Sequence, residues 1–262
     1  MSAPRLASGL ALLAAAAAAP AFGQSDVDLA AELANPVAAL ISVPFQNNLD
    51  FGGGTGDAFR YNLNIQPVVP VTLTPSWNLI VRTIVPVLYT ERVYDDHRAG
   101  LGDITQSFFF SPSQPVNGIT WGLGPAVLYP SGTNGYSQRQ WGVGPTGVLL
   151  RQSGPWIFGA LVNHIWGMGG APDGSEAVNA TFLQPFLNYI TPSQTTFFLN
   201  TETTYDWSRQ QWTVPINAGV NQLVSIGGQR VQVGAGIRYF AEKPDGGPDW
   251  GIRLNLVFVF PK

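Results

Sequence analysis

From about residue 38 onward, apolar and polar residues alternate along the chain in runs separated by turn-forming residues. In the run 77–89 the odd-numbered positions are apolar or threonine, whereas Asn78 and Arg82 lie among the even-numbered positions. A period of two places these two sets of side chains on opposite faces of a β-strand. The alternation predicts about twelve strands, at 38–50, 58–73, 76–90, 103–111, 117–130, 139–151, 155–167, 177–190, 195–207, 210–223, 229–240 and 249–260.

The predicted strands have the length that a membrane requires. Trp77 and Tyr89 are twelve residue steps apart on one apolar face. At roughly 3.3 Å per residue and a tilt of about 45°, these steps span about 28 Å, close to the apolar band of an outer membrane. The runs 59–73 and 250–260 likewise have one apolar face and one face with Arg, Asn or Gln. We therefore expect apolar faces that contact lipid and polar faces that line an interior.

The connections between the predicted strands alternate between two kinds. The first kind is generally longer and carries most of the acidic residues: 52–57, 91–102, 131–138, 168–176, 208–210 and 241–249. The second kind is mostly short and nearly uncharged: 74–76, 111–118, 152–155, 191–194 and 225–229. Bacterial outer-membrane barrels have long extracellular loops, short periplasmic turns and an even number of strands. The predicted fold class is therefore all-β, a transmembrane antiparallel up-and-down β-barrel.

The composition agrees with a membrane barrel. Only 11% of the 262 residues are charged, against about 25% in soluble globular domains, which leaves little charge to cover a water-exposed surface. Outside the first 23 residues no apolar run reaches 20 residues, so a helical membrane protein is excluded. The net charge is −3 and there is no basic run, so we expect no nucleic-acid partner.

Residues 1–23 have the pattern of a secretory signal peptide. Arg5 precedes an apolar core at 9–19, and Ala21-Phe22-Gly23 is a small-x-small cleavage sequence. We expect an exported chain from which this signal is cleaved. The alternative, an N-terminal membrane anchor, is disfavoured because the apolar run is short.

Residues 24–36 are predicted to form a short helical segment that precedes the barrel at 37–262. The helix is expected near Ser25–Leu33, with Pro36 beyond its end. The segment is acidic, whereas the predicted lumen is rich in arginine. We therefore expect the helix to lie in or under the periplasmic mouth as a partial plug.

Two stretches nearly repeat each other, WGLGPAVLYP at 121–130 and WGVGPTGVLL at 141–150. The second contains Gly-x-Gly-x-x-Gly, but a dinucleotide site needs a following helix, and Pro145 with the strand pattern after it contradicts one. We interpret the repeat as two neighbouring strands of the barrel. Pro125 and Pro145 would then face outward, and we expect bulges there because each lacks a ladder donor.

The eight tryptophans all lie at ends of predicted strands. Tryptophan favours membrane interfaces because its ring is apolar and its N–H is polar. The predicted membrane-interface girdle is Trp77, Trp121 and Trp156 at one edge, and Trp141, Trp166, Trp207, Trp212 and Trp250 at the other. Arg139 and Arg151 have outward parity at the two rims, where arginine suits contact with lipid phosphates.

The alternation also places charged side chains inside the barrel. The predicted lumen or substrate path consists of Arg60, Arg82, Glu202, Arg230, Arg238 and Arg253. An arginine-lined pore attracts anions or carboxylates. In the alternative, the arginines pair with Glu202, Asp50 and Asp206 and hold a plugged interior together. About twelve strands lie between the eight that fill with side chains and the sixteen that leave a channel, so both interpretations stay open.

The sequence gives no positive sign of catalysis. There is no cysteine, which excludes thiolate metal sites and cysteine nucleophiles. His97 lies beside Asp95 and Asp96, an arrangement more typical of a solvated loop than of a cation site. His164 is followed two residues later by Trp166, where outer-membrane phospholipases have a serine. We therefore expect no enzyme activity, no cofactor and no metal.

Four segments resemble a known family: 33–52 (LANPVAALISVPFQNNLDFG), 100–112 (GLGDITQSFFFSP), 124–133 (GPAVLYPSGT) and 160–167 (ALVNHIWG). They are similar to the bacterial outer-membrane phenol-degradation meta-pathway family, whose members are often labelled transporters and sometimes mislabelled neuromedin U. The resemblance covers nearly the whole mature chain. It implies a barrel in a Gram-negative outer membrane that passes small compounds, aromatic or hydrophobic ones among them. It supplies no catalytic or binding residues.

The sequence thus predicts a porin-like channel or transporter for passive uptake of small solutes, located in the bacterial outer membrane. The expected partners are outer-membrane lipid and lipopolysaccharide, the barrel-insertion machinery and a small-molecule solute. Three alternatives remain. The barrel could be non-conducting and structural or adhesive. It could be a lipid enzyme, which the lack of a nucleophile beside histidine disfavours. The chain could also be a secreted soluble β-sandwich or lectin.

Overall fold

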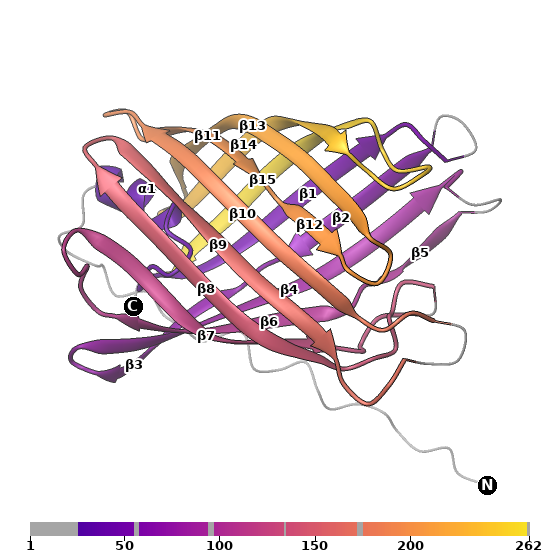
Figure 1. The fold of residues 1–262 in the computed structure, drawn as a ribbon. Helices are drawn as coiled ribbons and strands as arrows, with labels where there is room; N and C mark the ends of the chain where they lie inside the picture. Colours follow the sequence, from indigo (N-terminus) through magenta and orange to yellow (C-terminus); the bar gives the residue numbers. More distant parts are fainter. Residues whose placement is uncertain (1–25, 55–57, 94–96, 134, 172–174, 261–262) are drawn as a thin grey trace, which may run out of the picture.

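Strands dominate the computed structural model, which describes residues 26–54, 58–93, 97–133, 135–171 and 175–260 (Figure 1). One helix, α1 (Asp26–Leu33), precedes them. The strands are β1 (Ile41–Phe51), β2 (Phe59–Ile65), β3 (Val68–Thr74), β4 (Trp77–Glu91), β5 (Arg98–Leu101), β6 (Ile104–Pro112), β7 (Ile119–Tyr129), β8 (Gly142–Ser153), β9 (Trp156–Gly167), β10 (Asn179–Ile190), β11 (Thr195–Thr201), β12 (Thr203–Asp206), β13 (Gln211–Ile226), β14 (Gln229–Glu242) and β15 (Trp250–Phe260).

The sheet closes on itself. The first strand pairs with the last, from Ile41 opposite Phe260 to Phe51 opposite Trp250, and β10 pairs with β9 as well as with β11 and β12. Three barrel strands are each interrupted once, between β2 and β3, β5 and β6, and β11 and β12. The result is a closed antiparallel barrel of 12 strands, which confirms the predicted fold class and strand number.

The two faces of the strands differ as the alternation predicts. In β15, Trp250, Ile252 and Leu254 are exposed on the outside, whereas Arg253 between them is buried on the inside. Large apolar side chains are exposed around the whole exterior, up to 68% for Ile237. A continuous apolar surface of this size is unfavourable in water and suits a lipid environment. This exterior contradicts the alternative of a soluble sandwich.

The repeated Gly-Pro sequences lie where the strand ladder pauses. Pro125 and Pro145 are opposite each other across β7 and β8, and the register of this strand pair continues unshifted on both sides. The bulges expected at these prolines were therefore predicted wrongly. The side of each proline that lacks an N–H donor faces the other neighbouring strand, which is β6 for Pro125 and β9 for Pro145. The β6–β7 and β8–β9 ladders therefore skip two positions and then resume in the same register.

Gly124 and Gly144 explain why the ladder can pause without a bulge. A Cβ at Gly124 would overlap the carbonyl oxygen of Phe108, and a Cβ at Gly144 would overlap that of His164. The neighbouring backbones come this close only because glycine has no side chain. The missing proline donor is thus accommodated by close approach of the strands rather than by an inserted residue.

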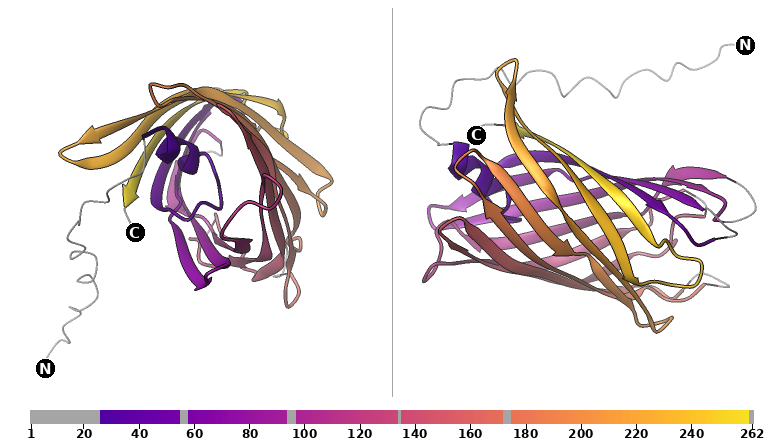
Figure 2. Two further views of the ribbon diagram at one scale, coloured as in Figure 1. Left: turned by 90° about the vertical axis from the view of Figure 1, so that its left-hand side faces the viewer. Right: turned by 90° about the horizontal axis from the view of Figure 1, so that it is seen from above.

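The helix and residues 34–40 lie inside the barrel end that has the short turns (Figure 2). Leu29 and Ala30 of α1 are buried. Ala30 and Val37 pack in one apolar cluster with inward-facing strand residues such as Ile157, which is the second residue of its strand after a tight turn. Short turns mark the periplasmic end of outer-membrane barrels, so α1 occupies the periplasmic mouth.

The predicted helix is confirmed, although apolar contacts hold it more than charge does. Asp26 forms an ion pair with Arg230 at the start of β14, as the charge argument anticipated. The buried residues of the helix, however, are Leu29 and Ala30. Within the described ranges there is no helix with the length and hydropathy to cross a membrane. The predicted signal peptide, residues 1–23, lies outside the described residues and stays a prediction.

We predict that Gly144→Ala lowers the free energy of unfolding by about 1–3 kcal/mol, because the new Cβ would overlap the His164 carbonyl. Gly147→Ala on the same strand is the control, since its Cβ would meet only the end of the flexible Leu123 side chain. Urea unfolding of the refolded protein in detergent, followed by tryptophan fluorescence, measures the difference. Equal stability of the two variants would contradict the close-approach explanation.

Candidate functional site

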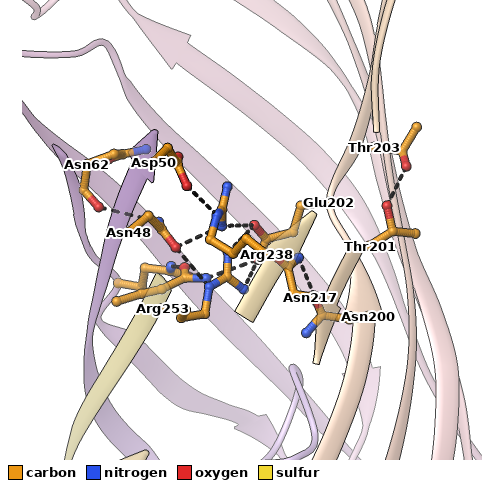
Figure 3. Close-up of polar contacts among 12 residues, drawn as sticks. Asn48, Asp50, Asn62, Asn200, Thr201, Glu202, Thr203, Asn217, Arg238 and Arg253 are labelled. Atoms are coloured by element: carbon orange, nitrogen blue, oxygen red, sulfur yellow. Dashed lines mark hydrogen bonds and ion pairs between the residues drawn. The ribbon is translucent and has the colours of Figure 1, made fainter. Parts of the chain in front are cut away.

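The interior of the barrel is crossed by a polar layer, which we call the lumen network. It consists of Asn48 and Asp50 on β1, Arg238 on β14, Arg253 on β15, and Glu202 between β11 and β12 (Figure 3). Three of these strands, β14, β15 and β1, are neighbours in the barrel, whereas Glu202 belongs to a strand beyond β13. The network therefore joins parts of the wall that no backbone ladder connects directly.

The lumen network is closely hydrogen-bonded. Arg253 donates to both carboxylate oxygens of Glu202, at 2.9 Å and 2.7 Å. Arg238 donates to Asp50 at 2.8 Å, and its Nη1 lies 3.7 Å from Glu202. Both arginines also donate to Oδ1 of Asn48, each at 2.8 Å. Two-point contact with a carboxylate fixes the plane of a guanidinium, so Arg253 is held in one orientation.

Strand register brings these side chains together. Asn48 lies opposite Arg253 on one side of β15, and Gly251 lies opposite both Asp50 and Arg238. A Cβ at Gly251 would overlap the Asp50 carboxylate. The small residue at this inward position therefore leaves the space in which Asp50 reaches Arg238.

Glu202 is positioned by an interruption of the wall. Pro185 on β10 and Pro215 on β13 belong to the strands on either side of it, and both ladders skip the positions next to Glu202. Proline lacks the amide N–H that a ladder needs. The β13–β14 register also shifts between Val214 and Pro215. The residue that carries the inward carboxylate thus lies at the break between β11 and β12.

Arg82 on β4 is linked to the network through two glutamines. Arg82 donates to Gln66 Oε1 at 2.7 Å, Gln66 donates to Gln46, and Gln46 donates to Glu202 at 3.0 Å. Each glutamine amide accepts a hydrogen bond on its oxygen and donates one from its nitrogen. The series of hydrogen bonds therefore runs in one direction, from the guanidinium to the carboxylate. The sequence analysis missed Gln46 and Asn48 as site residues, although their inward parity in the first predicted strand was a usable signal.

The other predicted lumen residues lie elsewhere. Arg60 donates to the carbonyl oxygens of Gly52, at 2.8 Å, and Gly246, and so fastens loops at the extracellular end. Arg230 lies at the opposite end, where it pairs with Asp26. The six predicted lumen residues therefore do not form one path.

The paired-interior alternative named three carboxylates, and the structure pairs two of them with lumen arginines. Asp50 contacts Arg238, and Glu202 contacts Arg253. Asp206 instead pairs with Arg209 at 2.7 Å, in a loop at the extracellular end. The predicted pairing of Asp206 with a lumen arginine is therefore wrong. Asp206 is the last residue of β12, so it lies near the rim of the barrel.

Two cavities lie inside the barrel, and the lumen network borders the turn-side one through Glu202 and Arg253. The turn-side cavity, of about 230 Å³, is lined by residues of 32–40 and by inward-facing side chains of several strands. The loop-side cavity, of about 370 Å³, is lined by apolar residues that include Leu161, Ile165 and Phe182, and by polar ones that include Thr105 and Asn163. Arg82 lines both cavities. The barrel is thus neither filled nor open throughout.

The tryptophans lie at the two ends of the strands. At the turn end, the rings of Trp77 and Trp121 are 5.8 Å apart. At the loop end, Trp250 stacks on Phe51 at 4.8 Å and Trp141 contacts Tyr129 at 5.2 Å. All the predicted girdle residues except Trp121 are exposed. This arrangement fits two interfacial belts, and the role of the girdle stays a prediction.

His164 has a hydroxyl partner that the sequence analysis did not find. It faces outward near the loop end, and its Nδ1 lies 2.7 Å from Oγ1 of Thr181, the residue opposite it on β10. Trp207 donates to the same hydroxyl oxygen at 2.8 Å. The search for a nucleophile considered only the histidine's own strand and found Trp166. The pairing of β9 with β10 decides which hydroxyl is adjacent.

His97 is exposed and lies directly before β5. The predicted neighbours of His97, Asp95 and Asp96, lie outside the described residues. The residues that are described include no group of three or more His, Asp or Glu side chains that could hold a metal ion.

The sequence matches no family profile and no curated protein. The fold, however, is similar to that of solved outer-membrane barrels. The COG4313 outer membrane channel from Pseudomonas putida F1 matches with a TM-score of 0.64 and 15% identity over 84% of this chain and 94% of that one. The outer membrane phospholipase of Salmonella typhi, solved as a dimer with bound calcium, matches with a TM-score of 0.51 and 11% identity over 90% and 99%. The Escherichia coli phospholipase A matches with a TM-score of 0.50 and 10% identity over 83% and 96%.

These comparisons establish a fold and correct one expectation. The chain has the fold of bacterial outer-membrane β-barrels, among them a channel, and this confirms the predicted location in the outer membrane. The expectation that the chain is not an enzyme is overturned, because barrels of the same fold are phospholipases. The sequence argument against catalysis also rested on position 166, whereas the hydroxyl beside His164 belongs to Thr181.

We predict that Glu202→Gln lowers the free energy of unfolding by about 3 kcal/mol, because Arg253, which is 2% exposed, would keep its charge without a partner. Glu176→Gln is the control, since its pair with Arg209 is exposed and should contribute less than about 1 kcal/mol. Urea midpoints in detergent give both values. Adding Arg253→Gln to Glu202→Gln should recover part of the loss; no recovery would show that the charge left behind is not the cause.

Proposed function

We propose that this barrel is an outer-membrane channel for the passive uptake of small solutes. The observation that carries the proposal is the pair of lumen cavities, about 230 Å³ and 370 Å³, with Arg82 on the border of both. A barrel that serves only as a structural element has no need of two such spaces in its interior. Small-molecule sites combine apolar walls with a few placed polar groups, and the loop-side cavity has this composition.

The N-terminal segment is the element that narrows the path. Residues of 32–40 line the turn-side cavity, and Ala30 and Val37 are buried against the inner wall. The segment is attached through apolar contacts and the Asp26–Arg230 ion pair rather than through strand ladders. Such a segment can move without opening the barrel wall, so we assign it the role of a partial plug at the periplasmic mouth.

We also infer that the chain belongs to the phenol-degradation meta-pathway family, on the four sequence segments described above, and that its solutes include aromatic or hydrophobic compounds. The apolar wall of the loop-side cavity, with Leu161, Ile165 and Phe182, supports this solute class. The similar barrel from Pseudomonas putida F1 is described as a channel.

The surroundings of the barrel follow from its exterior. The apolar outer face fits lipid, and the exposed rim residues Arg139 and Arg151 suit lipid phosphates and the phosphates of lipopolysaccharide. We propose that the barrel-insertion machinery places it in the outer membrane, as for other barrels of this fold.

A non-conducting structural or adhesive barrel is the second candidate. The buried pair of Arg253 with Glu202 favours it, because this pair ties β15 to the segment between β11 and β12 across the lumen. The two functions differ in flux: a channel passes solute when it is placed in a vesicle, and a structural barrel does not.

We predict that deleting residues 24–34 from the mature chain raises single-channel conductance several-fold, because α1 and the contacts of Ala30 would be removed from the periplasmic mouth. Planar-bilayer recordings and liposome swelling with small uncharged solutes measure the effect. Glu242→Gln, an exposed change at the opposite end of the barrel, is the control and should leave conductance unchanged.

A heat-modifiability gel should show that both proteins remain folded barrels. Unchanged conductance after the deletion would reject the plug. No flux through either protein would reject the channel and favour the structural barrel.

A further inference from the structure

We propose that the loop-side cavity is a binding site for a small amphipathic monoanion, such as an aromatic carboxylate, whose carboxylate binds Arg82 and whose ring lies against the apolar wall. The proposal rests on the proposed channel function, and it names the solute class that the channel would select.

Positive charge exceeds negative charge around the lumen network. There are two carboxylates, Asp50 and Glu202, and three guanidinium groups, Arg82, Arg238 and Arg253. Arg238 pairs with Asp50, and Arg253 pairs with Glu202. Among these five groups one positive charge is left over: Arg82 has no ion pair among the described residues, although Glu32 also lines the turn-side cavity. An uncompensated charge away from water is unfavourable, and a bound anion would neutralise it.

Arg82 has hydrogen-bond donors that its protein partners do not use. A guanidinium has five N–H donors in a planar fork that matches a carboxylate. In the described residues its hydrogen bond is the one from Nη2 to Gln66, at 2.7 Å. Gln66 and Gln46 connect it to Glu202 and hold the side chain in place from one side. The residue lines both cavities.

The loop-side cavity has the size and the wall chemistry of a small-molecule site. Its volume of about 370 Å³ lies at the lower end of the range of about 300–1,000 Å³ that is usual for small-molecule sites. Leu161, Ile165 and Phe182 give it an apolar wall, and Ile84 and Leu128 extend that wall. A ligand that buries an apolar ring here and reaches Arg82 with one charged group fits both ends of the cavity.

The charges at the mouth do not cancel this preference. Asp206 also lines the cavity, but Arg209 binds it at 2.7 Å, and the backbone N–H groups of Ser208 and Arg209 donate to its other oxygen. Arg209 is itself exposed, and exposed charges are screened by salt over about 8–10 Å. Arg82 is therefore the charge that an anion meets at the inner end.

The test is isothermal titration calorimetry on the folded mature chain in detergent, with benzoate, its neutral isostere benzamide, and formate. We expect benzoate to bind at least tenfold more tightly than either of the others. Arg82→Gln should reduce benzoate affinity at least tenfold and leave benzamide unchanged, whereas Arg82→Lys should retain part of the affinity. Arg139→Gln at the rim is the matched control and should change nothing.

A second variant tests the apolar wall and does not remove a charge. Leu161→Asn should reduce benzoate affinity severalfold and leave formate unchanged. Equal binding of benzoate and benzamide, or full benzoate affinity in a folded Arg82→Gln barrel, would overturn the proposal. Equal binding of formate and benzoate would reduce the site to a simple anion site and would overturn the assigned ligand class.

These outcomes are separable from the failure of the channel itself. Benzoate binding that depends on Arg82, without solute flux into vesicles, would support the site and reject the channel. Flux of uncharged solutes without selective benzoate binding would support the channel and reject the site.

Discussion

The structure depends on one constraint: in lipid, each backbone N–H and C=O must find its partner within the protein. A closed antiparallel ladder meets this demand, and the pairing of β1 with β15 completes the closure. Closure forces side chains to alternate between lipid and lumen, so apolar and polar residues separate with a period of two. The ladder stays closed even at Pro125 and Pro145, which lack a donor. There Gly124 and Gly144 let the neighbouring backbones approach each other closely.

The same alternation concentrates charge in the lumen. The charged side chains at the middle of the barrel point inward, where Arg253 meets Glu202 and Arg238 meets Asp50. These pairs join strands that are not neighbours. Arg82 borders both cavities, and among the described residues it has no ion pair of its own. The lumen network is thus a brace across the barrel, and the proposed selectivity rests on Arg82 beside it.

The outer face has its own chemistry. The His164–Thr181–Trp207 cluster shows that two strands can place a hydroxyl and an imidazole side by side on the lipid-facing surface. Similar barrels are known both as a channel and as phospholipases. A fold of this kind supports more than one chemistry, and function has to be argued from particular residues.

Most of the fold could be predicted from the sequence, because strand period, turn length and low charge are local properties of the chain. The run 77–89 and the loop alternation were sufficient to predict a barrel of about twelve strands. Parity also indicated that Arg82, Arg238, Arg253 and Glu202 face inward. The helix was predicted from a capping Ser25 or Asp26 and from Pro36, but its burial through Ala30 was not, since burial depends on the far wall.

Only the tertiary structure decided which inward residues meet. Parity specifies a face and says nothing about the distance between strands that lie apart in the barrel. Asp206 therefore pairs with Arg209 rather than with a lumen arginine, and His164 finds Thr181 on the next strand. The sequence by itself determined the barrel, its two faces and the side chains that enter the lumen. Register and closure decided which of those side chains pair, because pairing across a lumen is a long-range property. Among the described residues they leave Arg82, at the border of the two cavities, without an ion pair.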